Sequence, residues 1–165
     1  MVKHRKKFAL ITICFVCCSF ISLNYFTSQD NAVPYPEGYR EWAHVKTAVV
    51  EPGNAAFDHF GGFHHIYANK LAMEGYKTAN FADGSVIVFD VLEAIDTTKL
   101  LLEGRRRQLD VMVRNTDRYA STGGWGFEEF RGDSKTERTV MNAASTTCYS
   151  CHSRKASLVF SEWRR

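Results

Sequence analysis

The sequence has little of what builds a disulfide-stapled protein, a repeat array or a nucleic-acid-binding surface. Its 165 residues include only three prolines and five cysteines, and three of the cysteines lie within the first 18 residues. The remaining two cannot form a disulfide framework. Of the 21 basic and 18 acidic residues, four basic and one acidic fall in residues 1–30, which leaves 17 of each in residues 31–165. This neutral body lacks the electrostatic footprint of nucleic-acid binding, so we expect no nucleic-acid partner.

Long apolar runs are also missing, with one exception at the N-terminus. Phe8 to Leu23 form an apolar stretch that follows a basic segment from Lys3 to Lys7. This is the pattern of a secretory signal peptide, and the stretch is short for a membrane-spanning helix, which needs about 20 apolar residues. We therefore predict a signal peptide or an N-terminal membrane anchor in residues 1–30 and a single domain in residues 31–165. Either leader exports the domain to the periplasm or cell envelope, and an uncleaved leader anchors it to the cytoplasmic membrane.

One motif near the C-terminus indicates which chemical group the protein binds. Residues 146–152 read Thr-Thr-Cys-Tyr-Ser-Cys-His, so Cys148 and Cys151 are three positions apart and His152 follows directly. This spacing is typical of haem c attachment, in which two thioether bonds hold one edge of the porphyrin and the adjacent histidine binds the iron. A structural zinc site needs four ligands and a thioredoxin-like pair needs a βαβ context, and the sequence has neither. We predict one covalent haem c per chain, with His152 as the proximal iron ligand.

The late methionine that is the second iron ligand of many small electron-transfer cytochromes c is missing. No methionine follows His152. The other methionines of the body are Met73, Met112 and Met141. If residues 109–114 form a strand, Met112 shares a face with Asp110 rather than with the apolar residues of that strand, which argues against a role as a ligand.

Periodicity predicts an α+β fold, with an antiparallel β-sheet and flanking helices. Residues 85–92 are rich in β-branched side chains, follow the turn signal Asp83-Gly84 and are largely apolar on both faces, as in a central strand. The other predicted strands are residues 45–50, 64–68, 109–114 and 125–130. The predicted helices are residues 37–43, 70–77, 116–120 and the region of the haem motif.

The order of several short motifs resembles the cytochrome P-460 family, which includes the cytochromes c′-beta. Tyr39-Arg40-Glu41-Trp42 comes first, then Asp83-Gly84-Ser85-Val86, then Gly123-Gly124-Trp125-Gly126-Phe127 and the terminal Cys-x-x-Cys-His. The resemblance covers about residues 34–163. It implies a sheet-rich homodimer with one haem c per chain, and a five-coordinate iron that is bound by the proximal histidine and open on its other, distal side.

The same resemblance singles out Phe89. Members that oxidise hydroxylamine link a lysine to the porphyrin ring, in a pattern like Asp-Gly-x-Val-x-Val-Lys. Phe89 occupies the lysine position here, and its ring has no nucleophilic nitrogen. The chain is therefore similar to the c′-beta branch, which has aromatic residues over the distal face and binds nitric oxide and carbon monoxide. Phe60 and Phe63 are two candidates for a second distal aromatic. His64 falls near the distal arginine of the oxidising members, where it either hydrogen-bonds a ligand or faces solvent.

Three functions fit the sequence, in the following order. The first is a gas-binding cytochrome, because Phe89 predicts an apolar distal pocket that favours neutral diatomic ligands. The second is an enzyme that oxidises hydroxylamine or uses peroxide, which needs a polar distal group such as His64. The third is electron transfer with a redox partner, which needs an exposed haem edge.

Overall fold

A computed structural model describes residues 32–164 of the chain. The predicted leader, residues 1–30, lies outside the described residues. Within residues 32–164, no helix has the length and apolarity needed to cross a bilayer.

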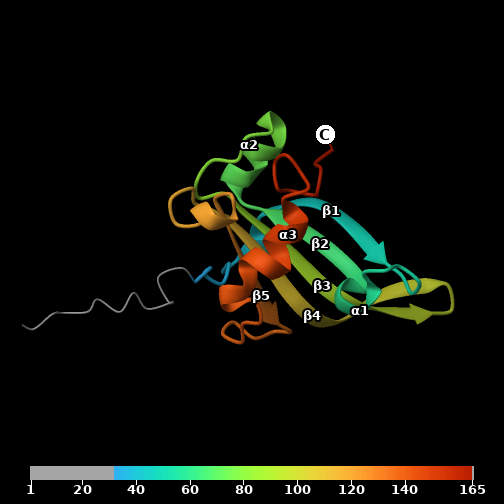
Figure 1. Ribbon diagram of the computed structural model, residues 1–165. Coiled ribbons are helices and arrows are strands. Elements are labelled where there is room, and N and C mark those ends of the chain that lie inside the picture. Colours follow the sequence, from blue (N-terminus) through green and yellow to red (C-terminus); the bar gives the residue numbers. More distant parts are fainter. Residues whose placement is uncertain (1–31, 165) are drawn as a thin grey trace, which may run out of the picture.

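The domain is built on one five-stranded antiparallel sheet in which each strand pairs with the next along the chain, in the order β1-β2-β3-β4-β5 (Figure 1). The strands are β1 (Ala43–Val50), β2 (Gly62–Ala68), β3 (Val86–Thr97), β4 (Leu100–Arg114) and β5 (Trp125–Arg131). The α-helices are α1 (Phe57–Phe60), α2 (Lys70–Thr78) and α3 (Ser150–His152). The predicted α+β fold, an antiparallel sheet with flanking helices, is confirmed.

The predicted central strand is β3, which lies between β2 and β4 and is buried on both sides. Ile87, Val88 and Val91 are each 0% exposed. β3 and β4 run well past the predicted ends and form a long hairpin that projects beyond the other strands (Figure 1, yellow). Thr98 and Lys99 close it with positive φ angles of 43° and 73°, as in the two-residue turns that match the twist of a hairpin.

The pairing register assigns each side chain to one of two faces, because directly paired residues of antiparallel strands point to the same side. We call one the Phe89 face; its members include Ile66, Ile87, Phe89, Met112 and Phe127. We call the other the Asp90 face; its members include Tyr67, Val88, Asp90, Leu109, Val111 and Phe130.

Different parts of the chain cover the two faces. The Phe89 face packs against α2 and against the C-terminal segment that carries the haem motif, and α3 crosses this side of the sheet in Figure 1. The Asp90 face packs against the segment that precedes β1. The packed residues of that segment are Val33, Tyr35, Tyr39 and Trp42.

A buried carboxylate fastens the N-terminal segment to the Asp90 face. Asp90 is 0% exposed and accepts hydrogen bonds from Arg106 (2.6 Å), Tyr39 (2.6 Å) and Arg40 (2.7 Å). Burial raises the pKa of Asp90, but the hydrogen bonds from Arg106 and Tyr39 outweigh it, so the net shift of the pKa is downward. Asp90 therefore stays charged and ties residues 39 and 40 to the sheet.

The helix predicted in residues 37–43 is wrong. Only Tyr39–Glu41 form a turn of 3-10 helix, because Gly38 is left-handed (φ 68°) and Trp42 is already extended. The anchoring of Tyr39 and the packing of Trp42 on the Asp90 face decide the local structure, and β1 begins at Ala43.

The helix predicted in residues 116–120 is also wrong. Asp83 accepts hydrogen bonds from the backbone N–H and the hydroxyl of Thr116, which fixes a turn there. A 3-10 turn follows at Ala120–Thr122 and ends at Gly123, which has a φ of 66°. The helix predicted in residues 70–77 is confirmed as α2, which is capped where Asn69 accepts a hydrogen bond from the N–H of Ala72 (2.9 Å).

Candidate haem site

The haem motif lies on a helical segment that packs against the Phe89 face. A π-helical turn at Ser145–Tyr149 runs into α3, a kind of irregularity that is common at functional sites. Cys148 and Cys151 are free thiols, half-buried and exposed respectively. Residues three apart on a helix are neighbours on one side of it, so both thiols can bond to one edge of a single planar group.

His152 is held so that one ring nitrogen remains available to a metal. Its Nδ1 lies 2.6 Å from the carbonyl oxygen of Leu158. A carbonyl only accepts, so Nδ1 carries the hydrogen and donates it, and the lone pair of the neutral ring is on Nε2. The ring centroid lies 4.9 Å from that of Phe127 and 5.0 Å from that of Phe160. Burial lowers the pKa of His152, which favours the neutral form that binds iron.

Phe89 lies on the sheet face that the haem motif packs against. It is half-buried and belongs to the same apolar cluster as Cys148, Tyr149 and Leu158. Its neighbours in the register are Ile66 on β2 and Asp110 on β4. The structure therefore places Phe89 and the predicted haem motif, which are about sixty positions apart in the sequence, against the same apolar cluster.

The three other predicted pocket residues divide between the two faces. His64 pairs with Val91 and lies on the Phe89 face, where its Nε2 contacts the carbonyl oxygen of Phe60. Burial lowers the pKa of His64, so its neutral form is favoured. Phe60, in α1, lies beside His64, with ring centroids 6.0 Å apart. Phe63 lies on the Asp90 face, stacked on His65 with ring centroids 5.8 Å apart, so the structure does not bring it to Phe89.

A polar cluster beside Phe89 was missed by sequence reasoning. Gln108 Nε2 donates to both oxygens of Asp110 (3.1 and 3.2 Å) and to Glu129 (3.1 Å). Glu129 in turn pairs with His59 of α1 at 3.0 Å. Burial, and then the charge of Glu129, raise the pKa of Asp110 to about 8. The Phe89 face is thus apolar on one side of Phe89 and acidic on the other.

One part of this cluster was predictable from the sequence. The strand pattern already placed Asp110 on the face of Met112, and the structure confirms that placement. Met112 itself is only 5% exposed and packs in the core between Ile87 and Phe127. The pairing of Asp110 with Glu129 depends on the register between β4 and β5, which no sequence pattern supplied.

A second buried acid positions the chain that leads into the haem motif. Glu128 is 4% exposed and accepts hydrogen bonds from the backbone N–H of Val140 (3.0 Å) and of Met141 (3.2 Å). Arg138 lies 3.3 Å from its other oxygen. Glu128 therefore anchors the residues that immediately precede the helical segment of Cys148 and His152.

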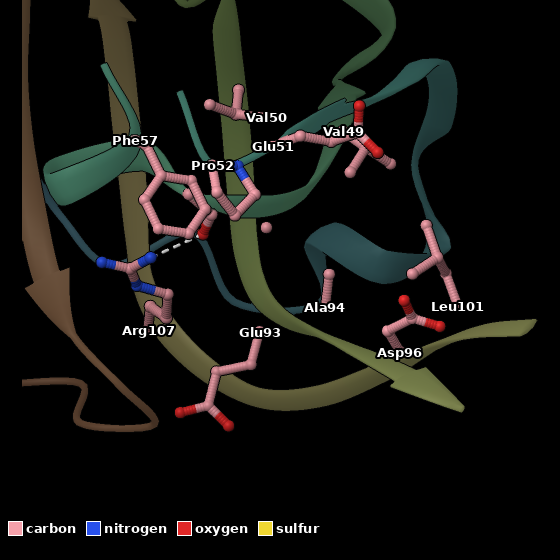
Figure 2. Close-up of a pocket in the computed structure, with 12 residues that line it drawn as sticks. Val49, Val50, Glu51, Pro52, Phe57, Glu93, Ala94, Asp96, Leu101 and Arg107 are labelled. Carbon is pink, nitrogen blue, oxygen red and sulfur yellow. Dashed lines mark hydrogen bonds between the residues drawn. The ribbon is translucent and has the colours of Figure 1, made fainter. Parts of the chain in front are cut away.

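One cavity among the described residues lies elsewhere, between β1, α1 and the base of the β3–β4 hairpin. Its volume is about 320 Å³, and Val49, Phe57, Leu101 and Arg107 are among the residues that line it. Figure 2 shows Arg107 beside Phe57, where the guanidinium donates to the carbonyl oxygens of Gly61 (2.7 Å) and Asp58 (2.8 Å). None of the predicted site residues lines this cavity.

The groups around the motif fit a haem better than a bare metal ion. Cys148 and the oriented imidazole of His152 lie against the apolar Phe89 face, and the exposed Cys151 is on the same helical segment. Within residues 32–164 no cluster of three or more His, Cys, Asp or Glu side chains is arranged to hold a metal. The family model for Cytochrome P460 matches residues 36–161. The chain belongs to the cytochrome P-460 family. It is therefore a haem-binding cytochrome, and its sheet with a few helices is consistent with the P-460 fold. No curated protein matches the chain.

Proposed function

We propose that this P-460 family member is an exported cytochrome with one covalent haem c, whose five-coordinate iron binds nitric oxide or carbon monoxide. The observation that carries the proposal is Phe89, an aromatic residue on the sheet face that packs against the haem motif, where oxidising relatives have a lysine. When bound, the haem supplies the iron that holds the gas. An apolar ring beside that iron favours neutral diatomic ligands over anions.

Covalent attachment is tested by the mass of the denatured protein and its haemochrome spectrum. We expect one haem per chain, and its loss from Cys148→Ala with Cys151→Ala. A haem that acid–acetone extracts from the wild-type protein would contradict the attachment. His152→Ala is expected to retain the covalent haem but lose the Soret band of a histidine-ligated iron, because the ring whose Nδ1 donates to Leu158 is then gone.

Gas binding is tested by spectra of the holoprotein in the ferric state, in the ferrous state, and with carbon monoxide or nitric oxide. We expect a ferrous five-coordinate spectrum and saturable binding of carbon monoxide without displacement of a protein side chain. A six-coordinate, low-spin spectrum in both oxidation states would reject the proposal in favour of electron transfer.

The acidic cluster favours a second candidate function, a haem enzyme that oxidises hydroxylamine or uses peroxide. Asp110, with a pKa raised to about 8, keeps a proton at neutral pH beside Phe89, and a protonated carboxyl can act as a general acid. Steady-state turnover of hydroxylamine with an electron acceptor, or of peroxide, lost in Asp110→Asn, would rank this function first. Absence of turnover in wild type leaves the gas-binding function.

A homodimer is the assembly that we propose, and the projecting β3–β4 hairpin supports it. Residues 93–106 extend past the pairing with β2 and β5, so both outer edges of this ribbon are free in the described chain. Ile95 and Leu102 pair across the ribbon, and with Leu100 they are 46–57% exposed on one side. Unpaired edges with exposed aliphatic side chains are association surfaces. Leu100→Lys with Leu102→Lys should give a monomer by light scattering, and an unchanged mass would refute this interface.

Export completes the proposal. The basic and apolar pattern of residues 1–30 is typical of a leader, and haem c is attached outside the cytoplasmic membrane in bacteria. Fractionation of cells that express the whole chain tests this, since removal of the leader is expected to abolish covalent haem. A chain that matures equally well without its leader would contradict export.

A further inference from the structure

One row of paired residues crosses all five strands on the Phe89 face. Its members, in order from β1 to β5, are Lys46, Ile66, Phe89, Asp110 and Glu129. Paired residues point to the same side, so all five face the side on which the haem motif packs. The row has a cation at one end, apolar residues in the middle and two carboxyl groups at the other end.

The cationic end of the row is free to take a partner. Lys46 is half-buried, and among residues 32–164 no carboxylate or other acceptor lies within ion-pair or hydrogen-bond distance of its ammonium. Lys77 and Lys135, by contrast, pair with glutamates at 2.8 and 2.6 Å. Within the described residues, the Lys46 ammonium therefore remains available to pair with an anionic ligand.

Four other basic groups on or beside the Phe89 face already have partners. Arg107 donates to two backbone carbonyls, His59 pairs with Glu129, and His64 contacts the carbonyl of Phe60. Arg114 donates to the carbonyl of Gly123. Lys46 is thus the basic side chain of this row, and its charge has no partner among the described residues.

The acidic end of the row lies beside the haem attachment. Cys148 packs against the apolar cluster that includes Met112 of β4 and Phe127 of β5, the two strands that carry Asp110 and Glu129. The charges of Asp110 and Glu129 are, after burial, among the causes that raise the pKa of the Cys148 thiol. In haem c the thioether bonds are on one edge of the porphyrin and the two carboxylate side chains are on the opposite edge. The haem carboxylates are therefore expected to point away from this end of the row, where the charge of Glu129 would repel them.

We propose that Lys46 binds the carboxylate edge of the haem, so that the charges of the row fix how the haem lies across the Phe89 face. This inference rests on the proposed attachment of haem c at Cys148 and Cys151. β1 lies three strand positions from β4, about 14 Å at the usual strand spacing, a span that a porphyrin and an extended lysine side chain bridge together. The half-buried Phe89 supplies the apolar floor between the two ends.

The reduction potential of the holoprotein tests the proposal. A positive charge near the porphyrin stabilises the ferrous state, so Lys46→Gln should shift the ferrous-to-ferric ratio at a fixed potential toward ferric by about tenfold, as expected for a unit charge roughly 10 Å away at an effective dielectric constant near 20. Lys46→Arg, which keeps the charge, should leave the ratio close to wild type. The resonance Raman band of the haem carboxylate side chains should shift in Lys46→Gln.

The matched control is Lys70→Gln, which removes an exposed lysine from α2, outside the row. If Lys46→Gln and Lys70→Gln have the same potential and the same Raman band as wild type, Lys46 is an ordinary surface lysine and the inference is overturned. If Lys46→Gln yields no holoprotein, Lys46→Met, which keeps the apolar stem, carries the same measurement. A wild-type protein without covalent haem would instead refute the proposed function, so the two failures are distinguishable.

Discussion

Phe89 and Asp110 are paired residues of β3 and β4, so an apolar ring and a carboxyl group lie side by side on the Phe89 face. With a pKa raised to about 8 by burial and by Glu129, Asp110 is mostly protonated at neutral pH. In that form it places no charge beside the ring, and the surroundings of Phe89 remain compatible with a neutral ligand. It also keeps a proton available near the proposed ligand site.

Truncation of Phe89 should open the site. Phe89→Ala is expected to speed the association of carbon monoxide with the ferrous protein about tenfold, by removal of roughly 1.4 kcal/mol of steric barrier. Loss of the half-buried ring should lower the unfolding free energy by about 2 kcal/mol, less than loss of a fully buried phenylalanine ring would. Flash photolysis and urea unfolding measure the two effects. Phe89→Leu, the size-conserving control, should change both less, and equal rates in all three proteins would show that Phe89 does not line the ligand path.

Asp110 should make stability depend on pH in the direction opposite to an ordinary carboxylate. Its folded pKa of about 8 is above the ordinary value of 3.8 for an aspartate, so the folded state binds more protons than the unfolded state between these values. The stability contributed by its protonated form is complete below about pH 4 and is lost as the pH rises through about 8. Urea midpoints of the holoprotein at pH 5 and pH 9 should therefore differ more in wild type than in Asp110→Asn. Asp117→Asn, at an exposed position, should behave as wild type, and so would Asp110→Asn if this account were incorrect.

Local patterns predicted the strands of this fold far better than its short helices. Residues 85–92 are largely apolar on both faces of a strand, and this pattern indicated the buried centre of the sheet. The spacing of the haem motif predicted Cys148, Cys151 and His152 as the haem ligands, and this stays a prediction. Trp42 and Thr116, in contrast, are held by distant partners, the Asp90 face and Asp83. The pairing of Asp110 with Glu129 and the placement of Lys46 depend on strand register, which is a property of the whole sheet.

Neutralisation of Asp90 should lower the stability of the folded protein. Asp90→Asn leaves the half-buried Arg106 with only the exposed Asp133 as its anion and removes the anchor of Arg40, which we expect to lower the unfolding free energy by about 3 kcal/mol at pH 7. Because the folded pKa of Asp90 is depressed, its contribution is present above its ordinary pKa and is lost as the pH falls through the folded value. The difference between wild type and Asp90→Asn in urea should thus shrink below about pH 3.8. A constant difference down to pH 2 would contradict this assignment.

Glu128 should matter for maturation as well as for stability. Glu128→Gln weakens the acceptor for the N–H groups of Val140 and Met141 and its pairing with Arg138, at a cost of about 2 kcal/mol. We expect a lower yield of covalent haem per chain, measured by haemochrome absorbance, because the haem motif is then less firmly placed. Glu137→Gln breaks an exposed pair with Arg131 and should cost less than about 1 kcal/mol. Equal haem yields in both variants would confine Glu128 to a role in stability.

The bonds from Tyr39 and Arg40 to Asp90 also fix the side of the sheet on which the described chain begins. They hold residues 33–42 on the Asp90 face, while the haem motif packs on the opposite face. A tether that continued from residue 32 would therefore leave from the back of the sheet. The side that carries Cys148 and His152 would then look outward, toward ligands and partners rather than toward the point of attachment.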